Sequence, residues 1–216
     1  MDKKSKMNSF SVGLGLFDYI NPVFYAITSI TLIKNLYQTM DKNLFVIMVI
    51  GCIISMIFGL SIPTLKFIVG LGKVKFKMPV NLVFYVNTGL FITGLALLKH
   101  TLSISTSTIL VAAIVSILLL RLIYSKTKKF NTVAVLMGLI GYSFIHISLI
   151  TYAINYGYTL SIVLYAIAIV LQIFLVLLGC FSNLKLPRVH WTIEITNVCC
   201  QGVVAISTIL LFNNIM

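Results

Sequence analysis

The chain has 216 residues, of which 60% are hydrophobic and only 9% are charged, and its mean hydropathy is +1.09. Soluble domains are about 25% charged, so this composition excludes a soluble globular protein. The net charge of +12 does not indicate nucleic-acid binding, because the basic residues fall in short stretches between apolar segments. The sequence predicts an all-α, polytopic integral membrane helix bundle, with residues 1–216 forming one transmembrane domain surrounded by lipid.

Seven apolar stretches are long enough to cross about 30 Å of hydrocarbon as helices. In chain order they cover residues 16–36, 44–62, 80–98, 106–124, 130–153, 160–181 and 189–212. The first stretch has a second interpretation. Asn21-Pro22 is typical of a helix N-cap followed by proline at the first helical position, and residues 9–20 would then lie along the membrane interface.

Lysine and arginine gather in alternate connections between these stretches. The basic side holds the N-terminal tail 1–9 and the loops 63–79, 125–129 and 182–188. The other side holds only Lys34, Lys42 and Lys99. Because short loops rich in Lys and Arg remain in the cytoplasm, we expect a cytoplasmic N-terminus and an external C-terminus. The basic loops are then expected to contact anionic lipid.

The last apolar stretch contains the segment HWTIEITNVCCQ, which carries one of the four acidic residues of the chain. His190, Glu194, Asn197 and Gln201 are spaced four, three and four residues apart, so they share one face of a helix. Polar groups at membrane depth face the bundle interior or a water-filled cavity. This face of the last helix is therefore expected to point inward and to bind a substrate or an ion.

Depth in the membrane suggests which residues of other spans accompany this face. Arg121 and Asp18 are expected near the level of Glu194, as its ion-pair partners. Asn87 and Gln172 are expected nearer the middle, with Asn197 and Gln201. The sequence thus predicts a charged group toward the cytoplasm that leads to a layer of amides.

The sequence contains no pattern that supports a metal site or a catalytic site. His100, His146 and His190 are expected at three different depths, so they cannot share a metal ion, and no zinc-protease motif is present. The four cysteines fall in apolar segments without paired spacing and are expected to be reduced. No metal, no cofactor and no enzymatic activity are therefore predicted.

Two functional hypotheses stay open. The chain is a small transporter or permease, or the membrane subunit of one, in which Glu194 binds a cation or proton. Alternatively, it is an accessory, sensor or immunity-type subunit that acts through protein or lipid contacts, with Glu194 paired to Arg121 in a closed bundle. A cavity reaching Glu194 and Gln201 favours the first. A partner subunit or a homo-oligomer fits either, and the Ile- and Lys-rich, Trp-poor composition favours the plasma membrane of an AT-rich bacterium.

Overall fold

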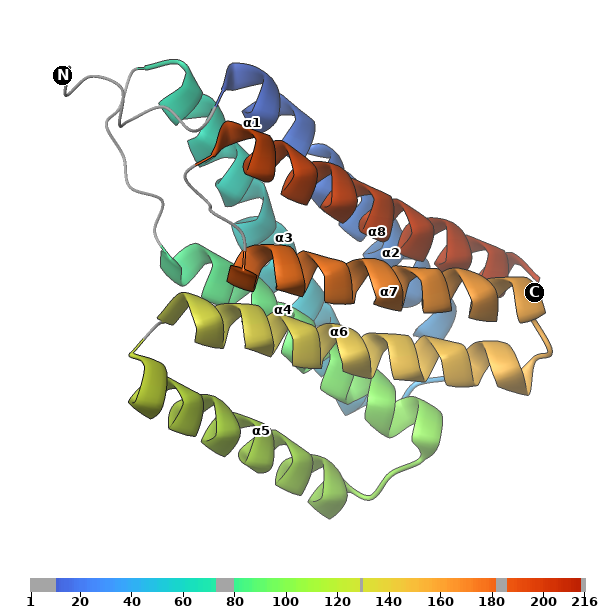
Figure 1. The fold of residues 1–216 in the computed structure, drawn as a ribbon. Helices are drawn as coiled ribbons and strands as arrows, with labels where there is room; N and C mark the ends of the chain where they lie inside the picture. The colour runs from blue at the N-terminus through green and yellow to red at the C-terminus, as the bar shows by residue number, and fades with distance from the viewer. Residues whose placement is uncertain (1–10, 73–79, 129, 182–185, 215–216) are drawn as a thin grey trace, which may run out of the picture.

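The computed structural model describes residues 11–72, 80–128, 130–181 and 186–214 (Figure 1). Within these ranges the chain forms eight α-helices: α1 (Val12–Asp18), α2 (Ile20–Leu36), α3 (Lys42–Gly70), α4 (Val80–Leu102), α5 (Thr106–Thr127), α6 (Phe130–Asn155), α7 (Thr159–Phe181) and α8 (Pro187–Asn213). Helices α1 and α2 together make the first of seven segments that are long and apolar enough to cross a membrane. The predicted all-α fold, with seven segments long and apolar enough to cross a membrane, is confirmed for the described residues.

The first span is broken between α1 and α2 at Tyr19. Pro22 has no amide hydrogen to donate to the carbonyl of Asp18, so the helical ladder is interrupted one turn before the proline. The N-cap of α2 is Tyr19, and not Asn21 as predicted, because Asn21 and Pro22 already lie within the helix. Helix α1 packs closely along α3: a Cβ on Gly15 would lie 2.6 Å from the Phe67 nitrogen.

Helix α3 is longer than the sequence suggested. The loop predicted at 63–79 is wrong in its first part, because the helix continues through Pro63 and Lys66 to Gly70. It ends where Gly72 adopts a left-handed backbone with φ +69°, a conformation that glycine accepts without strain. The remainder of that predicted loop, residues 73–79, lies outside the described residues.

Close backbone contacts join α3, α4 and α6. A Cβ on Gly51 of α3 would lie 2.5 Å from Thr93 Oγ1 of α4, and one on Gly141 of α6 would lie 2.7 Å from the Phe91 nitrogen of α4. Small residues at such contacts let helices approach closely in membranes. Helix α8 packs against α7 and α2, whereas α5 lies at the periphery beside α6 and α4 (Figure 1).

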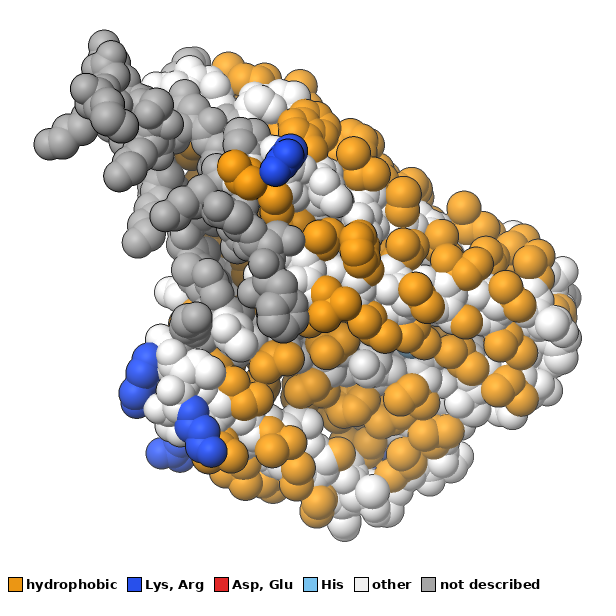
Figure 2. Space-filling view, viewed as in Figure 1, with side chains coloured by type: hydrophobic (Ala, Val, Ile, Leu, Met, Phe, Trp, Pro, Cys, Tyr) orange, Lys and Arg blue, Asp and Glu red, His pale blue; other side chains and the backbone are white. Residues whose placement is uncertain are grey.

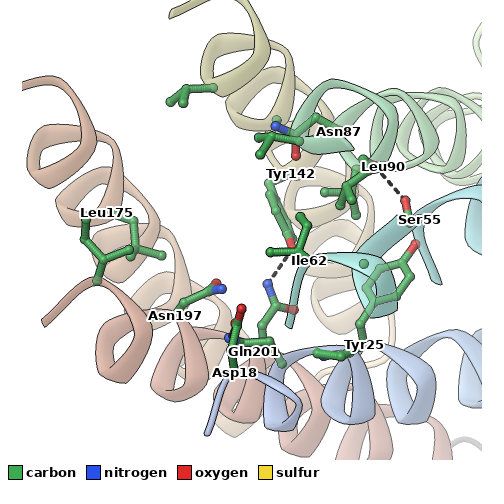
Figure 3. A pocket seen from close by; sticks show the side chains of 18 of the residues that line it. Asp18, Tyr25, Ser55, Ile62, Asn87, Leu90, Tyr142, Leu175, Asn197 and Gln201 are labelled. Atoms are coloured by element: carbon green, nitrogen blue, oxygen red, sulfur yellow. Dashed lines mark hydrogen bonds between the residues drawn. The ribbon is translucent and has the colours of Figure 1, made fainter. Parts of the chain in front are cut away.

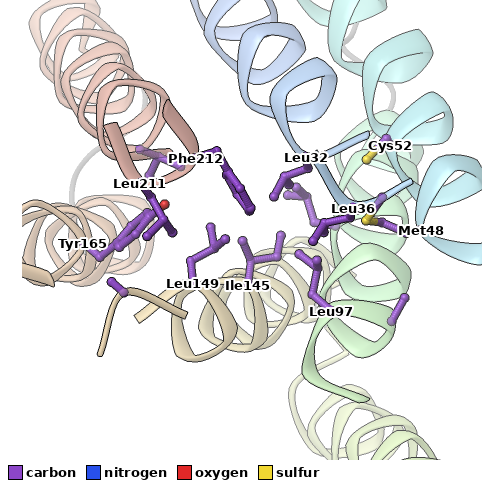
Figure 4. Close-up of a cluster of buried hydrophobic side chains, with 14 of the residues drawn as sticks. Leu32, Leu36, Met48, Cys52, Leu97, Ile145, Leu149, Tyr165, Leu211 and Phe212 are labelled. Atoms are coloured by element: carbon purple, nitrogen blue, oxygen red, sulfur yellow. The ribbon is translucent and has the colours of Figure 1, made fainter. Parts of the chain in front are cut away.

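The two ends of the bundle differ. The start of α1, the last turns of α3, α5 and α7 and the first turns of α4, α6 and α8 lie at one end, called here the basic end, and the last turn of α8 lies at the far end (Figure 1). Hydrophobic side chains cover the visible long side of the bundle, and Lys and Arg lie toward the basic end (Figure 2). Toward the far end, the interior is packed with buried apolar side chains (Figure 4), among them Leu32, Leu36, Met48, Leu97, Leu149, Leu211 and Phe212.

Candidate functional site

A cavity of about 350 Å³ lies among the end of α1 and helices α2, α3, α4, α6, α7 and α8 (Figure 3). Each helix contributes residues from its half nearer the basic end, such as Val83 of α4, Gly179 of α7 and Glu194 of α8. Pockets for small molecules have volumes of about 300–1,000 Å³, so this cavity is large enough for a small solute. We call it the central cavity.

A cluster of four polar side chains forms one wall of the central cavity. Asp18 ends α1, Asn21 lies in the first turn of α2, Lys66 lies near the end of α3, and Glu194 lies in the second turn of α8. The break before Pro22 sets Asp18 and Asn21 beside each other, and the close packing of α1 on α3 brings Lys66 to them. We call Asp18, Asn21, Lys66 and Glu194 the charged cluster.

The charged cluster is a closed ring of hydrogen bonds. Lys66 Nζ donates to Asp18 Oδ2 at 2.6 Å and also to Glu194 Oε1. Asn21 Nδ2 donates to Asp18 Oδ1 at 2.8 Å and to Glu194 Oε2 at 3.3 Å. The four residues are buried, with exposed fractions of 4% for Asp18, 8% for Asn21, 7% for Lys66 and 6% for Glu194. Two carboxylates therefore share the same two donors inside the protein.

The charges of this cluster do not balance. With all three groups ionised, Lys66 contributes one positive charge, while Asp18 and Glu194 contribute two negative charges. An uncompensated charge in a low-dielectric interior costs several kcal/mol. Each carboxylate oxygen accepts one hydrogen bond from Lys66 or Asn21, and the carboxyl groups of Asp18 and Glu194 also lie within hydrogen-bonding distance of each other, so that one proton can be shared between them. The cluster is therefore suited to take up one proton or one additional cation.

Amide side chains line the deeper part of the central cavity: Asn87, Gln172, Asn197 and Gln201. Gln201 Nε2 donates to the hydroxyl of Tyr142, and Asn197 lies between Gln201 and the α7 wall (Figure 3). Asn87 Nδ2 donates to the Ala134 carbonyl at 2.7 Å. These amides provide donors and acceptors at the depth where the apolar core begins.

The central cavity brings together six of the eight residues selected from the sequence: Asp18, Asn87, Gln172, Glu194, Asn197 and Gln201. His190 lies half-buried near the start of α8 and does not line the cavity. The predicted pairing of Arg121 with Glu194 is wrong. Arg121 is exposed on the peripheral helix α5, and Lys66 occupies the position beside Glu194 instead.

Sequence reasoning missed several residues of the site. Lys66 was assigned to a loop and Asn21 to a helix cap, whereas both belong to the charged cluster. The signal for Lys66 was available, because the apolar residues Phe67, Ile68 and Val69 follow it and continue the helix. Tyr142 was missed because a single tyrosine in an apolar span does not reveal which way it points.

Among the described residues, no group of three or more His, Cys, Asp or Glu side chains is placed to hold a metal ion. The chain matches no protein-family model, no curated protein and no solved structure.

Proposed function

We propose that the protein is a small transporter or permease, or the membrane subunit of one, whose charged cluster binds the coupling proton or cation. The observation that carries this proposal is the central cavity, which reaches Glu194 and Gln201 inside the membrane-spanning part of the fold. Ionisable residues at membrane depth are costly and are typical of substrate and ion pathways. A cavity wall with one excess negative charge suits a site for a proton or cation.

The asymmetry of the bundle adds support. The central cavity occupies the half toward the basic end, while apolar side chains such as Leu36, Leu149 and Phe212 close the other half (Figures 3 and 4). A carrier that works by alternating access needs a conformation open to one side and closed to the other. Broken helices beside the binding site, such as α1–α2, also occur in transporters.

We further propose that the basic end faces the cytoplasm of a bacterium, with the C-terminus outside the plasma membrane. The positive-inside rule supports this orientation, and moving Lys66 from a loop into α3 leaves the asymmetry of the loops in place. Lipid is the immediate partner, with anionic lipid at the basic end and a second membrane subunit or a copy of the chain as further partners.

One observation favours the alternative, a non-catalytic accessory, sensor or immunity-type subunit. Every carboxylate oxygen of Asp18 and Glu194 has a donor within the ring, as expected if these hydrogen bonds serve only to hold α1, α2, α3 and α8 together. A purely structural ring would remain intact during function, whereas a transport site must exchange its ligand.

Ion flux in liposomes distinguishes the two functions. The purified protein is reconstituted with a pH-sensitive dye inside, and gradients of H⁺, Na⁺ and K⁺ are imposed in turn. We expect ion-driven proton movement above that of protein-free liposomes, loss of this movement in Glu194→Gln, and no change in Arg121→Gln, whose side chain is exposed on α5. Equal rates in the wild type, Glu194→Gln and protein-free liposomes would contradict a transport role.

A further inference from the structure

The charged cluster lacks a hydrogen-bond donor as well as a positive charge. Asn21 uses its Nδ2 for Asp18 and Glu194, but its Oδ1 is a buried acceptor without a partner in the described structure. Asn21 is 8% exposed and lines the central cavity. Buried polar atoms nearly always have a hydrogen-bond partner, so the unpartnered Oδ1 shows that the cluster is one donor short, although this atom itself lies behind the cavity surface.

The rest of the central cavity is unlike a site for a bare ion. Its volume of about 350 Å³ exceeds what one ion fills. Aliphatic side chains from several helices form much of its wall, among them Ile62, Val86, Leu90, Leu175 and Ile193. The amides Asn87 and Asn197 offer additional hydrogen bonds. The ligand therefore has an apolar body as well as a charged donor group.

We propose that the central cavity binds a small organic monocation with an N–H donor, such as a primary or secondary ammonium. Its ammonium group would donate to the carboxylate oxygens of Asp18 and Glu194, which line the cavity, and its body would lie against the aliphatic wall. Together with Lys66, one additional positive charge balances the two negative charges of Asp18 and Glu194. This inference rests on the proposed transport function and names the class of cation that the charged cluster binds.

Other ligand classes fit less well. An anion would meet the excess negative charge of the cluster. A neutral solute would require the cluster to take up a proton to balance its charge, whereas a cation balances the ionised cluster directly. A metal ion held by both carboxylates would compete with the Lys66 ammonium, which already bonds to Asp18 and Glu194. An ammonium ion does not have to displace Lys66, because the oxygens of Asp18 and Glu194 keep lone pairs that can accept a further hydrogen bond.

The first test uses ligands of one size and different charge. The full-length protein in nanodiscs is titrated at constant pH with butylammonium, 1-butanol or butyrate, and the thermal unfolding midpoint is followed. A ligand that binds only the folded state raises this midpoint by an amount that grows with the ratio of the ligand concentration to its dissociation constant. We expect butylammonium alone to raise it, with an apparent affinity at least about tenfold weaker in Glu194→Gln or Asp18→Asn, the loss expected for one charge-assisted hydrogen bond.

The second test reverses the charge preference. Lys66→Gln removes the internal cation, so the cluster then lacks two positive charges, and 1,4-diaminobutane dication should replace butylammonium as the preferred ligand. Arg121→Gln, on the exposed side of α5, should leave the preference unchanged. If Lys66→Gln does not yield folded protein, the ligand titrations of Glu194→Gln and Asp18→Asn still test the proposed ammonium site.

Two results would overturn the inference: equal stabilisation by butylammonium and 1-butanol, or undiminished stabilisation by butylammonium in both carboxylate variants. The proposed function is tested separately by ion flux. Glu194-dependent flux without ammonium binding would reject only the proposed ligand class. Absence of both flux and ammonium binding would reject the transport proposal as well.

Discussion

Lys66 and Glu194 form the same ion pair, but the charge balance of the cluster makes them unequal. Lys66 is the cation between two buried carboxylates, whereas Glu194 shares the negative charge with Asp18. Removal of one partner from a buried ion pair is costly when it leaves a charge uncompensated. Removing Lys66 leaves two such charges, while removing the charge of Glu194 leaves a balanced pair of Lys66 and Asp18.

We therefore predict that Lys66→Met lowers the free energy of unfolding by about 3–5 kcal/mol or more, the range for breaking a buried ion pair. Glu194→Gln should lower it by no more than about 1 kcal/mol, because the amide still accepts from Lys66 and the excess charge is gone. Unfolding of the purified variants in nanodiscs provides the measurement, with the exposed Arg121→Gln as control. Equal destabilisation by both substitutions would contradict the charge balance described for the cluster.

At the residue scale, sequence could identify polar groups and their depth but not their lateral position. Glu194, Asn197 and Gln201 share a face because helical spacing requires it, and the cavity contains all three. Arg121 has a suitable depth, but it lies on a helix at the periphery of the bundle. The partner of Glu194 is 128 residues away in sequence, on a helix that packing alone brings to it.

At the scale of the helices, glycines set how closely α3 approaches α4. Gly51 and Gly59 lie on the same helix, eight residues apart, but in different surroundings. A Cβ on Gly51 would lie 2.5 Å from Thr93 Oγ1 and 2.7 Å from the Gly89 carbonyl oxygen, whereas one on Gly59 would meet nothing within 4 Å. The two positions make a matched pair for the same substitution.

Gly51→Ala is predicted to lower the free energy of unfolding by about 1–3 kcal/mol, as overpacking of a close contact does. Gly59→Ala should leave stability unchanged or raise it by up to about 1 kcal/mol, because alanine is the better helix former. Thermal unfolding of the two variants checks this. A Gly51→Ala variant as stable as Gly59→Ala would show that α3 and α4 are not in such close contact.

Hydropathy could predict the helices because each must be apolar across the membrane, and all seven predicted spans have counterparts in the fold. The end of α3 was misplaced because a lysine after a proline resembles a loop. Its helical continuation depends on two carboxylates from other helices, which compensate the buried charge of Lys66. The break at Tyr19 was also placed slightly wrongly, since Pro22 disrupts the turn before it and not its own.

For the whole molecule, we expect all seven candidate spans of the described residues to cross the membrane. Their odd number then predicts that the two ends of the chain lie on opposite sides, and the basic residues predict which side is which. Fusion of alkaline phosphatase to residue 214 should give an active enzyme in a bacterial host, while a fluorescent protein fused there should remain dark. The same reporters inserted after residue 128 should give the reverse result. An inactive phosphatase at the C-terminus would invert the orientation and place the central cavity on the external side.

The overall arrangement was less predictable than the spans. The sequence predicted a layer of amide side chains nearer the middle of the membrane than a charged group, and residues of both groups line the cavity. It could not show that one half of the bundle is open and the other packed with leucines and phenylalanine, because apolar residues occur in both halves of every span. That asymmetry depends on helix packing, which links residues far apart in the chain.

The most direct test of the central claim, that the charged cluster exchanges a proton or cation, is carbodiimide labelling of Glu194 in native membranes, measured by mass spectrometry from acidic to alkaline pH. Carbodiimides react with protonated carboxyls, and Glu194→Gln gives the background. We predict labelling that rises as the pH falls and is suppressed by added cations that bind the cavity. Absence of labelling at every pH in the wild type, with strong labelling in Lys66→Ala, would show a permanent structural ion pair and contradict a transport site at Glu194.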